Sequence, residues 1–530
     1  MLKTSVHINR FIRKNLGNTY FKNIHYLKDT TKTSAILTPG CLEFIESIHN
    51  NNIDKYHDVL ELRKQNNEKK QYFFREDTAE IRNSEWKANE LPNKLKNRNV
   101  EITGPGNSKK MIINAFNSHA DGYMLDLEDS MTPSWYNVIN GHHNIKEAAR
   151  GELVDYKYDN KGNLIKKYEI NNNNKLPKFF TRIRGLHMLE ENVLVNDKPV
   201  PATIFDMATF MYHNAKYMIE NNKGPYLYIP KLESYEDAKF INGLLNQTQT
   251  ELSIPIGTTK VTCLIETYPA IFQTEEIIFA LKDHIVGLNC GRWDYLFSMI
   301  KSLPKNHIMP YRDELSMDKE FLEDYVHQIV NSCHKRGILA IGGMSAFIPT
   351  SNAEENKKVL EKIKKDKITE IQRGCDGAWV AHPGLVKPIK ELFVEKLNGS
   401  DNLIHYLPEN RKKFNNTPKE SDFIILDNDL RKNINVSLQY ISAWLNGNGA
   451  VALNGMMEDL ATSEISVFQI KQWLTNREEM LSDGTNFVLD EDSFEKVLEE
   501  EYKKFICDNQ VPYANRNYEL AKKILKEYVL

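Results

Sequence analysis

Eight short apolar segments alternate with longer amphipathic stretches between residues 100 and 381. Short apolar runs of this kind are typical of strands buried on both faces of a parallel sheet, and the amphipathic stretches are typical of helices. No glycine-rich dinucleotide-binding turn follows the first run, which favours a (β/α)8 TIM barrel over an open doubly wound sheet. The sequence therefore predicts an α/β fold. The expected strands are 100–103, 122–128, 179–184, 226–231, 261–266, 285–289, 338–342 and 377–381.

Helical periodicity extends on both sides of the expected barrel. Residues 30–98 carry many charges at helical spacing, and residues 430–530 are helical by period after a polar linker at 408–419. One excursion, 154–170, has the pattern of a β-hairpin. We expect no strands after about residue 395. The predicted domains are a basic leader with a helical domain (1–98), the barrel (99–395) and a helical C-terminal domain (396–530).

The charge balance of the chain argues against a polyanionic partner. The 69 basic and 72 acidic residues leave a formal net charge of -3, so no overall field favours nucleic acid or an anionic membrane. No apolar run approaches the roughly 18 residues that a bilayer span needs. The six cysteines form no CxxC pair, which indicates a reducing compartment and no zinc site. We therefore expect a soluble protein without a nucleic-acid or membrane partner.

The two ends of the chain carry mixed signals about its compartment. The first 28 residues contain lysine and arginine but no acid before Asp29. This composition resembles an organelle transit segment, and it is equally consistent with a basic extension that has no targeting role. The final residues, Tyr528-Val-Leu530, do not match the Ser-Lys-Leu type of peroxisomal signal.

Two carboxylates end adjacent expected strands. Glu266 ends the apolar run 261–266, and Asp294 lies in the turn that begins at Gly291, after the next run. In a barrel, the loops at the carboxyl ends of the strands carry the active site. Hard oxygen ligands without a nearby cluster of histidine or cysteine favour Mg²⁺ over zinc. Solvated or salt-bridged rim carboxylates are the alternative that the spacing leaves open.

Arg182 lies inside an apolar strand, two positions before Arg184, so both side chains should face the same side. A guanidinium at a barrel mouth suits an oxyanion or a carboxylate. An ion pair across the strands with Asp126 or Glu128 is an equally good interpretation, and both roles can coexist. Gly291 lacks a Cβ, so a small carboxylate could approach the backbone there.

Other candidates for proton transfer have weaker support from the residues alone. His187, His284 and His382 lie on different elements, and we expect each to be structural. Asp459 follows a glycine-rich turn at the start of a helical pattern. An acid in that position usually caps the helix, so the pattern by itself does not select Asp459 for catalysis.

Several separate runs, in the same order, resemble the malate synthases, specifically the shorter isoform called A. The resemblance extends from about Leu37 to near the C-terminus, and so many ordered matches are not expected from barrel folds in general. The matching runs are Val100-Glu-Ile-Thr-Gly-Pro105, Leu127-Glu-Asp-Ser130, Arg182-Ile-Arg-Gly-Leu-His187, the stretch from Lys282 to Phe297, Ile341-Gly-Gly-Met344, Trp379-Val-Ala-His-Pro383 and Met457-Glu-Asp459.

The resemblance implies a fold and a set of roles. The fold would be a helical N-terminal clasp, a TIM barrel and a helical C-terminal plug that closes the barrel mouth. Glu266 and Asp294 would be the Mg²⁺ ligands, and Asp459 would be the catalytic base. Arg182 would be the electrophilic arginine. The glyoxylate seat would include the backbone of Gly291, Arg292 and Trp293.

The implied reaction condenses acetyl-CoA with glyoxylate and water to give malate and CoA, as in the glyoxylate cycle. An acetyl thioester is a weak carbon acid, so a base must work against an enolate whose developing charge an arginine can stabilise. Mg²⁺ bound to glyoxylate would orient the aldehyde and withdraw electron density from its carbon. The partners would be these small molecules. Neither the CoA contacts nor the oligomeric state follows from the sequence.

The chain departs from the family pattern at Val467, where an arginine is usual, and this puts in doubt any ion pair that relatives make there. An alternative class is the Mg²⁺-dependent lyases of malyl-CoA or citryl-CoA type. These lyases have a similar acidic rim, but they are generally shorter and lack a helical plug with a base. By family role the compartment would be the peroxisome or glyoxysome, with the mitochondrial matrix and the cytosol as alternatives.

Overall fold

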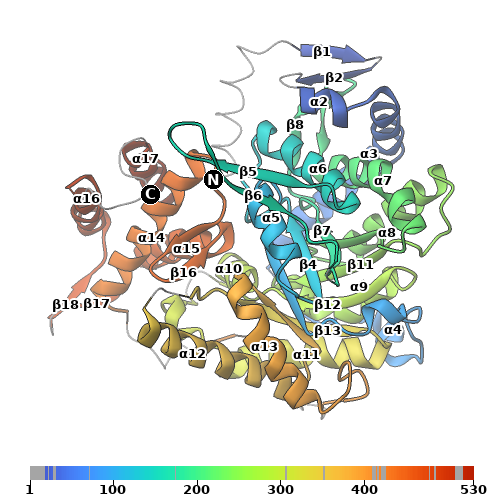
Figure 1. Ribbon diagram of the computed structural model, residues 1–530. Helices are drawn as coiled ribbons and strands as arrows, with labels where there is room; N and C mark the ends of the chain where they lie inside the picture. The colour runs from blue at the N-terminus through green and yellow to red at the C-terminus, as the bar shows by residue number, and fades with distance from the viewer. Residues whose placement is uncertain are drawn as a thin grey trace.

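A closed barrel forms the centre of the protein, with the N-terminal elements on one side and the C-terminal helices on another (Figure 1). No described helix is long and apolar enough to cross a membrane. The computed structural model describes residues 18–21, 23–27, 31–70, 72–173, 175–304, 307–349, 352–408, 414, 417–418, 425–476, 478–482, 485–507 and 517–530.

The barrel contains all of the expected strands, in parallel pairing and in chain order, so the predicted fold class is confirmed. Helices such as α7 (Ala202–Glu220) and α8 (Tyr235–Glu251) cover the outside. The strands are β3 (Val100–Pro105), β4 (Gly122–Asp126), β7 (Lys178–Arg182), β10 (Tyr226–Ile229), β11 (Lys260–Ile265), β12 (Ile285–Cys290), β13 (Leu339–Ser345) and β14 (Gly377–Val380).

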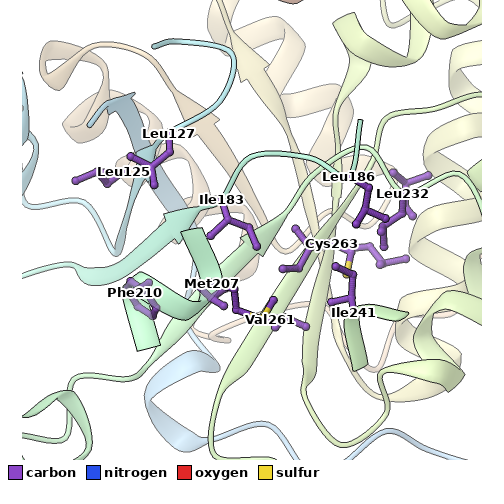
Figure 2. Close-up of a cluster of buried hydrophobic side chains, with 14 of the residues drawn as sticks. Leu125, Leu127, Ile183, Leu186, Met207, Phe210, Leu232, Ile241, Val261 and Cys263 are labelled. Carbon is purple, nitrogen blue, oxygen red and sulfur yellow. The ribbon is translucent and has the colours of Figure 1, made fainter. Parts of the chain in front are cut away.

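Alternate residues of most barrel strands pack into two different apolar clusters. On β4, Met124 belongs to the cluster inside the barrel, whereas its neighbour Leu125 packs outward under the helices. Figure 2 shows the outer cluster, where strand residues such as Cys263 meet Met207 of α7 and Ile241 of α8. Because both faces are buried, the strands read as almost continuous apolar runs. This is why their positions could be predicted.

The N-terminal region joins the barrel through both helices and strands. The helices α2 (Thr31–Ile36), α3 (Pro39–Lys69) and α4 (Ala79–Asn83) agree with the helical prediction. The strands β1 (Asn18–Phe21) and β2 (Ile24–Leu27) lie within the supposed leader and extend the pair β8 (Leu189–Val195) and β9 (Lys198–Pro201) to a four-stranded sheet. Residues 18–27 are therefore part of the fold, which the basic composition did not indicate. Residues 1–17 lie outside the described residues.

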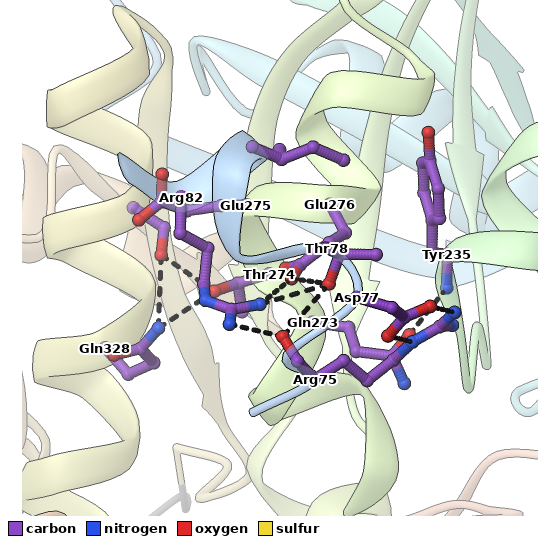
Figure 3. Close-up of polar contacts among 12 residues, drawn as sticks. Arg75, Asp77, Thr78, Arg82, Tyr235, Gln273, Thr274, Glu275, Glu276 and Gln328 are labelled. Atoms are coloured by element: carbon purple, nitrogen blue, oxygen red, sulfur yellow. Dashed lines mark hydrogen bonds and ion pairs between the residues drawn. The ribbon is translucent and has the colours of Figure 1, made fainter. Parts of the chain in front are cut away.

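Charged side chains fasten the segment before and within α4 to the barrel helices (Figure 3). Arg75 donates to both carboxylate oxygens of Glu236 on α8, each at 2.9 Å. Thr78 donates to Glu276 of α9 (Thr274–Ala280) at 2.7 Å, and Arg82 pairs with the same carboxylate. Glu276 is fully buried, so its charge is stabilised by these donors in place of water. The contacts are consistent with the predicted clasp.

The C-terminal region is mainly helical but also contains strands. Its helices are α14 (Asp427–Leu445), α15 (Leu460–Asn476), α16 (Glu491–Cys507) and α17 (Tyr518–Val529). The expectation that strands stop after residue 395 is wrong, because two short hairpins are present. Their strands have only three or four residues, too few for a periodic signal to stand out. They are β15 (Val451–Leu453), β16 (Met456–Glu458), β17 (Glu479–Ser482) and β18 (Thr485–Val488).

Two other sequence predictions concern connecting segments. The hairpin expected at 154–170 is confirmed as β5 (Val154–Tyr158) paired with β6 (Leu164–Glu169). The linker expected at 408–419 lies largely outside the described residues.

Candidate active site

A small cavity opens where the barrel strands end, and we call it the rim cavity. Its volume is about 60 Å³, and residues from the strand ends and from the C-terminal region line it together. All of the site residues predicted from the sequence and the family resemblance contribute to this lining: Arg182, Glu266, Gly291, Arg292, Trp293, Asp294 and Asp459. The closed barrel brings the strand ends together, as expected for this fold.

Three buried carboxylates of the rim converge on one point. Oxygens of Asp129, Glu266 and Asp294 all lie within 4.8 Å of one another, close enough to bind a single metal ion. Glu266 and Asp294 were predicted as a pair, but Asp129 was not. It lies three residues beyond the end of β4, in an acidic run that the sequence shows clearly. The side chain of Asp129 reaches the other two carboxylates only because of the conformation of the loop after β4, which the sequence does not reveal.

The charge state of these acids fits a site for a hard cation. Burial, and then the nearby Asp294, raise the pKa of Glu266 well above its usual range. Burial and the neighbouring Asp129 raise the pKa of Asp294 to about 6. One oxygen of Glu266, Oε2, is buried without a hydrogen-bond partner. A bound divalent cation would satisfy that oxygen and favour the ionised form of both groups.

Lys231 places an ammonium group among the same acids. Its Nζ lies 2.7 Å from Asp129, 3.1 Å from Glu128 and 3.2 Å from Asp294. Its backbone N–H donates to Glu266 Oε1 at 2.7 Å. Although burial alone would raise the pKa of Asp129, Lys231 and then Arg182 lower it. Lys231 ends one of the expected strands, but the sequence offered no reason to assign it a role, because a lysine at a strand end is common at protein surfaces.

Arg182 ends β7 and is held by an acid on the neighbouring strand. Its Nε and Nη2 each donate to the carboxylate of Asp126 at 2.6 Å, and its Nη1 donates to Asp129 at 3.2 Å. Asp126 also accepts hydrogen bonds from the backbone N–H groups of Glu128 and Ser130. The cross-strand pair considered as an alternative is therefore present. Arg182 nevertheless lines the rim cavity, so its orientation is fixed while it faces the site.

Gly291 is required by packing as well as by access to the backbone. A Cβ on this residue would lie 2.6 Å from Cβ of Glu266 and 2.9 Å from its Oε2. Any side chain would therefore displace Glu266. Helix α10 (Arg292–Ser302) starts at the next residue, and its first residues line the cavity. The first N–H groups of a helix have no partner within it and can bind an anion.

Arg292 and Trp293 begin α10 and both line the cavity. The Arg292 guanidinium lies 4.3 Å from the centre of the Trp293 ring, a cation–π contact. Burial lowers the pKa of Arg292, and Asp366 and Glu370 partly offset this effect. Arg292 is half-buried, so its charge lies near the cavity and is still partly open to water.

Asp459 enters the cavity from the C-terminal region, between β16 and α15. Its Oδ1 accepts from the Thr462 N–H at 3.2 Å, and its own N–H donates to Thr462 Oγ1 at 3.1 Å. It is thus a helix cap, the role that the local pattern suggested. Burial, followed by the charges of Asp129 and Asp294, raises its pKa to about 7. A carboxylate with such a pKa can accept a proton near neutral pH.

The histidines considered as alternatives lie in other surroundings. His284 is buried between Thr259 O and Asn246 Oδ1, each 2.9 Å away, and His382 accepts from the Gly384 N–H at the start of α13 (Pro383–Leu397). His187 lies in a neighbouring cavity, and burial lowers its pKa to about 3. None of the three lines the rim cavity.

Comparisons with known proteins show which family the chain resembles. A family model described as malate synthase, TIM barrel domain, matches residues 178–421, and one described as malate synthase, C-terminal, matches residues 425–530. The chain is 41% identical to malate synthase A of Escherichia coli (strain K12) over 421 residues, which cover 78% of this chain and 76% of that protein.

Two further relatives match over more of the chain. The identity to a malate synthase of Myxococcus xanthus (strain DK1622) is 38% over 464 residues, or 86% of this chain and 84% of that protein. The identity to a glyoxysomal malate synthase of Candida tropicalis is 38% over 482 residues, or 88% and 86%. These matches confirm the resemblance that the sequence motifs indicated.

Proposed function

The chain belongs to the malate synthase family and is an acyltransferase with malate synthase function, and we propose that the rim cavity condenses acetyl-CoA with glyoxylate and water to form malate and CoA. This reaction is consistent with a role in the glyoxylate cycle. The observation that carries the proposal is the convergence of Glu266, Asp294, Arg182 and Asp459 on one small cavity.

Glu266 and Asp294 are the proposed Mg²⁺ ligands, and Asp129 lies close enough to serve as a third. When bound, Mg²⁺ would polarise the aldehyde of glyoxylate and fix its orientation. Oxygen ligands alone, without histidine or cysteine in the cluster, suit Mg²⁺ rather than zinc. The buried, unpartnered oxygen of Glu266 is the feature that most directly supports a cation here.

The first turn of α10 provides the proposed seat for the glyoxylate carboxylate. Residues 291–294 line the cavity, and the first N–H groups of a helix have no partner within the helix itself. Arg292 adds a positive charge beside them. The cavity is small, about 60 Å³, and Glu266 and Asp294 also line a larger cavity next to it.

Asp459 is the proposed base that removes a proton from the methyl group of acetyl-CoA. Its raised pKa of about 7 makes the carboxylate a stronger base than an ordinary aspartate. The enolate that forms carries its charge on the thioester oxygen. Arg182 can donate to that oxygen, because the pair with Asp126 holds the guanidinium in place before the reaction starts.

The acetyl thioester needs a route to Asp459, and small side chains line one part of the rim cavity. Gly104 and Ala381 lie at the ends of the first and last barrel strands, and Ala450 comes from the C-terminal region. Their size leaves room for an extended thioester chain. We propose that acetyl-CoA enters between the barrel and the C-terminal region at this point.

A thiol-release assay tests the function directly. Purified protein should release free CoA from acetyl-CoA only when glyoxylate and Mg²⁺ are both present, and malate should accumulate in equal amount. Accumulation of malyl-CoA without free thiol would instead favour the lyase alternative. Turnover that continues unchanged after Mg²⁺ is chelated would contradict the metal assignment.

Asp294→Asn separates metal binding from the rest of the site. Mutation of residues that only orient metal ligands typically weakens metal binding about 10- to 100-fold. Removing an anionic ligand itself should weaken Mg²⁺ binding by at least that factor. Isothermal calorimetry of Mg²⁺ binding measures this effect. Asp427→Asn, at the start of α14, is the matched control and should bind Mg²⁺ like the unmodified protein.

Relatives from Candida tropicalis and Gossypium hirsutum are named glyoxysomal. On that similarity we propose a glyoxysomal or peroxisomal location for this enzyme. To test it, a fluorescent protein is inserted within the chain, so that neither terminus is blocked. Its location is then compared with that of a peroxisomal marker. Signal in mitochondria or cytosol would contradict the proposal.

A further inference from the structure

A second cavity lies at the opposite end of the barrel, where the strands begin, and we call it the base cavity. Lys178 and Tyr226, the first residues of β7 and β10, line it, whereas Arg182 at the other end of β7 lines the rim cavity. The volume of the base cavity is about 510 Å³. Sites for small organic ligands commonly have volumes of about 300–1,000 Å³.

Four lysines make the lining of the base cavity strongly positive. The only lining carboxylate among the described residues is Asp401, although the whole chain has a net charge of -3. None of the four lysines lies within ion-pair distance of a described carboxylate. Asp121, the acid with the strongest effect on Lys178, is itself bound to Lys390 at 2.6 Å. The lining lysines are Lys94, Lys175, Lys178 and Lys223.

Backbone carbonyls hold three of these ammonium groups in place. Lys94 donates to Asn222 O at 2.8 Å, Lys178 to Asn97 O at 2.6 Å, and Lys223 to Ala149 O at 3.0 Å. An ammonium group has three N–H donors, so each can make further hydrogen bonds into the cavity. Burial lowers the pKa of both Lys178 and Lys223, which shows that their charges are not fully compensated.

Apolar side chains form another part of the lining. Leu176, which is half-buried, and the edges of Phe116 and Phe179, at 4% and 5% exposure, contribute the accessible apolar surface, whereas Met218 is fully buried. A small inorganic anion would leave this surface unused. The combination of cations and an apolar wall favours an organic molecule with a charged end.

We propose that the base cavity binds a small metabolite that carries a doubly charged anionic group, such as a phosphomonoester or a dicarboxylate, on an apolar body. The lysines would bind the anion through charge-assisted hydrogen bonds, and the aromatic wall would contact the apolar body. The site is separate from the rim cavity and does not depend on the reaction proposed there.

Calorimetric titration with phenyl phosphate, benzylmalonate and inorganic phosphate tests the proposal. Phenyl phosphate or benzylmalonate should bind more tightly than inorganic phosphate, because only the first two can use the apolar wall. Whichever of the two binds better identifies the anion. Lys175→Gln combined with Lys223→Gln should weaken that binding by about tenfold for each lysine, since each removes a charged donor.

A control variant separates specific binding from general attraction of anions. Lys358 and Lys387 lie on α12 (Ala353–Gln372) and α13 and are 73% and 87% exposed, so changing both to glutamine removes the same charge elsewhere. This control should bind the probes normally. Equal binding by both double variants, or no binding to the unmodified protein at about 10 mM probe, would overturn the proposal. Basal turnover should be the same in all three proteins.

Discussion

The acids of the barrel rim and the acid of the C-terminal region are held in different ways. Asp129 and Asp294 lie within 3.2 Å of Lys231, and Asp126 is locked by Arg182, so several cross-strand charges fix the rim. Asp459 is held at the start of its own helix, where its carboxylate and its N–H both bond to Thr462. The difference suggests a division of labour, in which the barrel binds and orients one substrate and the C-terminal region supplies the base.

The two regions are nevertheless joined close to Asp459. Arg312, from the barrel side, pairs through two N–H groups with Glu458, and both residues are buried. Backbone hydrogen bonds from Met457 to Ala346 at 2.7 Å and from Ile348 to Gly455 at 3.1 Å attach the hairpin that precedes Asp459. The base is therefore positioned by contacts between domains, not by the barrel strands themselves.

Asp459→Asn should have the largest effect and tests whether the base and the substrate-binding residues act separately. The amide keeps the size of the side chain but cannot accept the methyl proton, so turnover should fall by about 10²- to 10⁴-fold. Binding of Mg²⁺ and glyoxylate, measured by calorimetry, should stay almost unchanged. If both turnover and binding were lost together, the two regions would not have separate roles.

Arg182→Lys tests the barrel half of the comparison. An ammonium cannot reproduce the planar fork that pairs with Asp126 and still faces the cavity, so we expect kcat to fall by about 100-fold. The effect should appear in kcat more than in KM for glyoxylate. Arg150→Lys is a suitable control, because Arg150 donates to backbone carbonyls away from the site. Near-normal turnover of Arg182→Lys would contradict the assigned role.

Glu458→Gln tests the junction between the two regions. The change leaves the buried Arg312 charge without its partner, which should lower the free energy of unfolding by about 3–5 kcal/mol. Urea denaturation followed by circular dichroism measures this loss. Glu500→Gln breaks an exposed pair with Arg431 and should cost less than about 1 kcal/mol. Equal effects of the two changes would show that the junction does not anchor the hairpin.

The smallest expected effect is a shift in the pKa of Asp459 when Mg²⁺ binds at the barrel rim. Such a shift would show that the two regions interact electrostatically. In Mg²⁺-free protein its pKa should lie near 7, because burial and two rim acids disfavour its charge. Mg²⁺ at the rim offsets those negative charges, so the pKa should fall on metal binding and the basic form should extend to lower pH. Carbon NMR of labelled aspartate, assigned with Asp459→Asn, measures this shift. A pKa near 4 without Mg²⁺ would contradict the linkage.

Much of this architecture could be predicted from local patterns. The barrel strands are buried on both faces, so residues such as Met124 and Leu125 are both apolar and the strand stands out in the sequence. The hairpin β15–β16 could not be predicted in the same way, because its strands are too short for a clear pattern. Glu266 and Asp294 could be paired because they end adjacent strands.

The remaining parts of the site depended on tertiary structure. Asp129 and Lys231 lie in loops whose direction the sequence does not specify, and they meet only because the barrel closes β4 and β10 around the same rim. By its local pattern Asp459 is a helix cap, and only the family resemblance singled it out. Its part in the cavity, and its raised pKa, come from the docking of a separate domain against rim acids. The sequence alone determined the strands and the acids that end them, because burial leaves a local pattern. Which charges converge was decided by the fold, since electrostatic interactions act through space between residues that are distant along the chain.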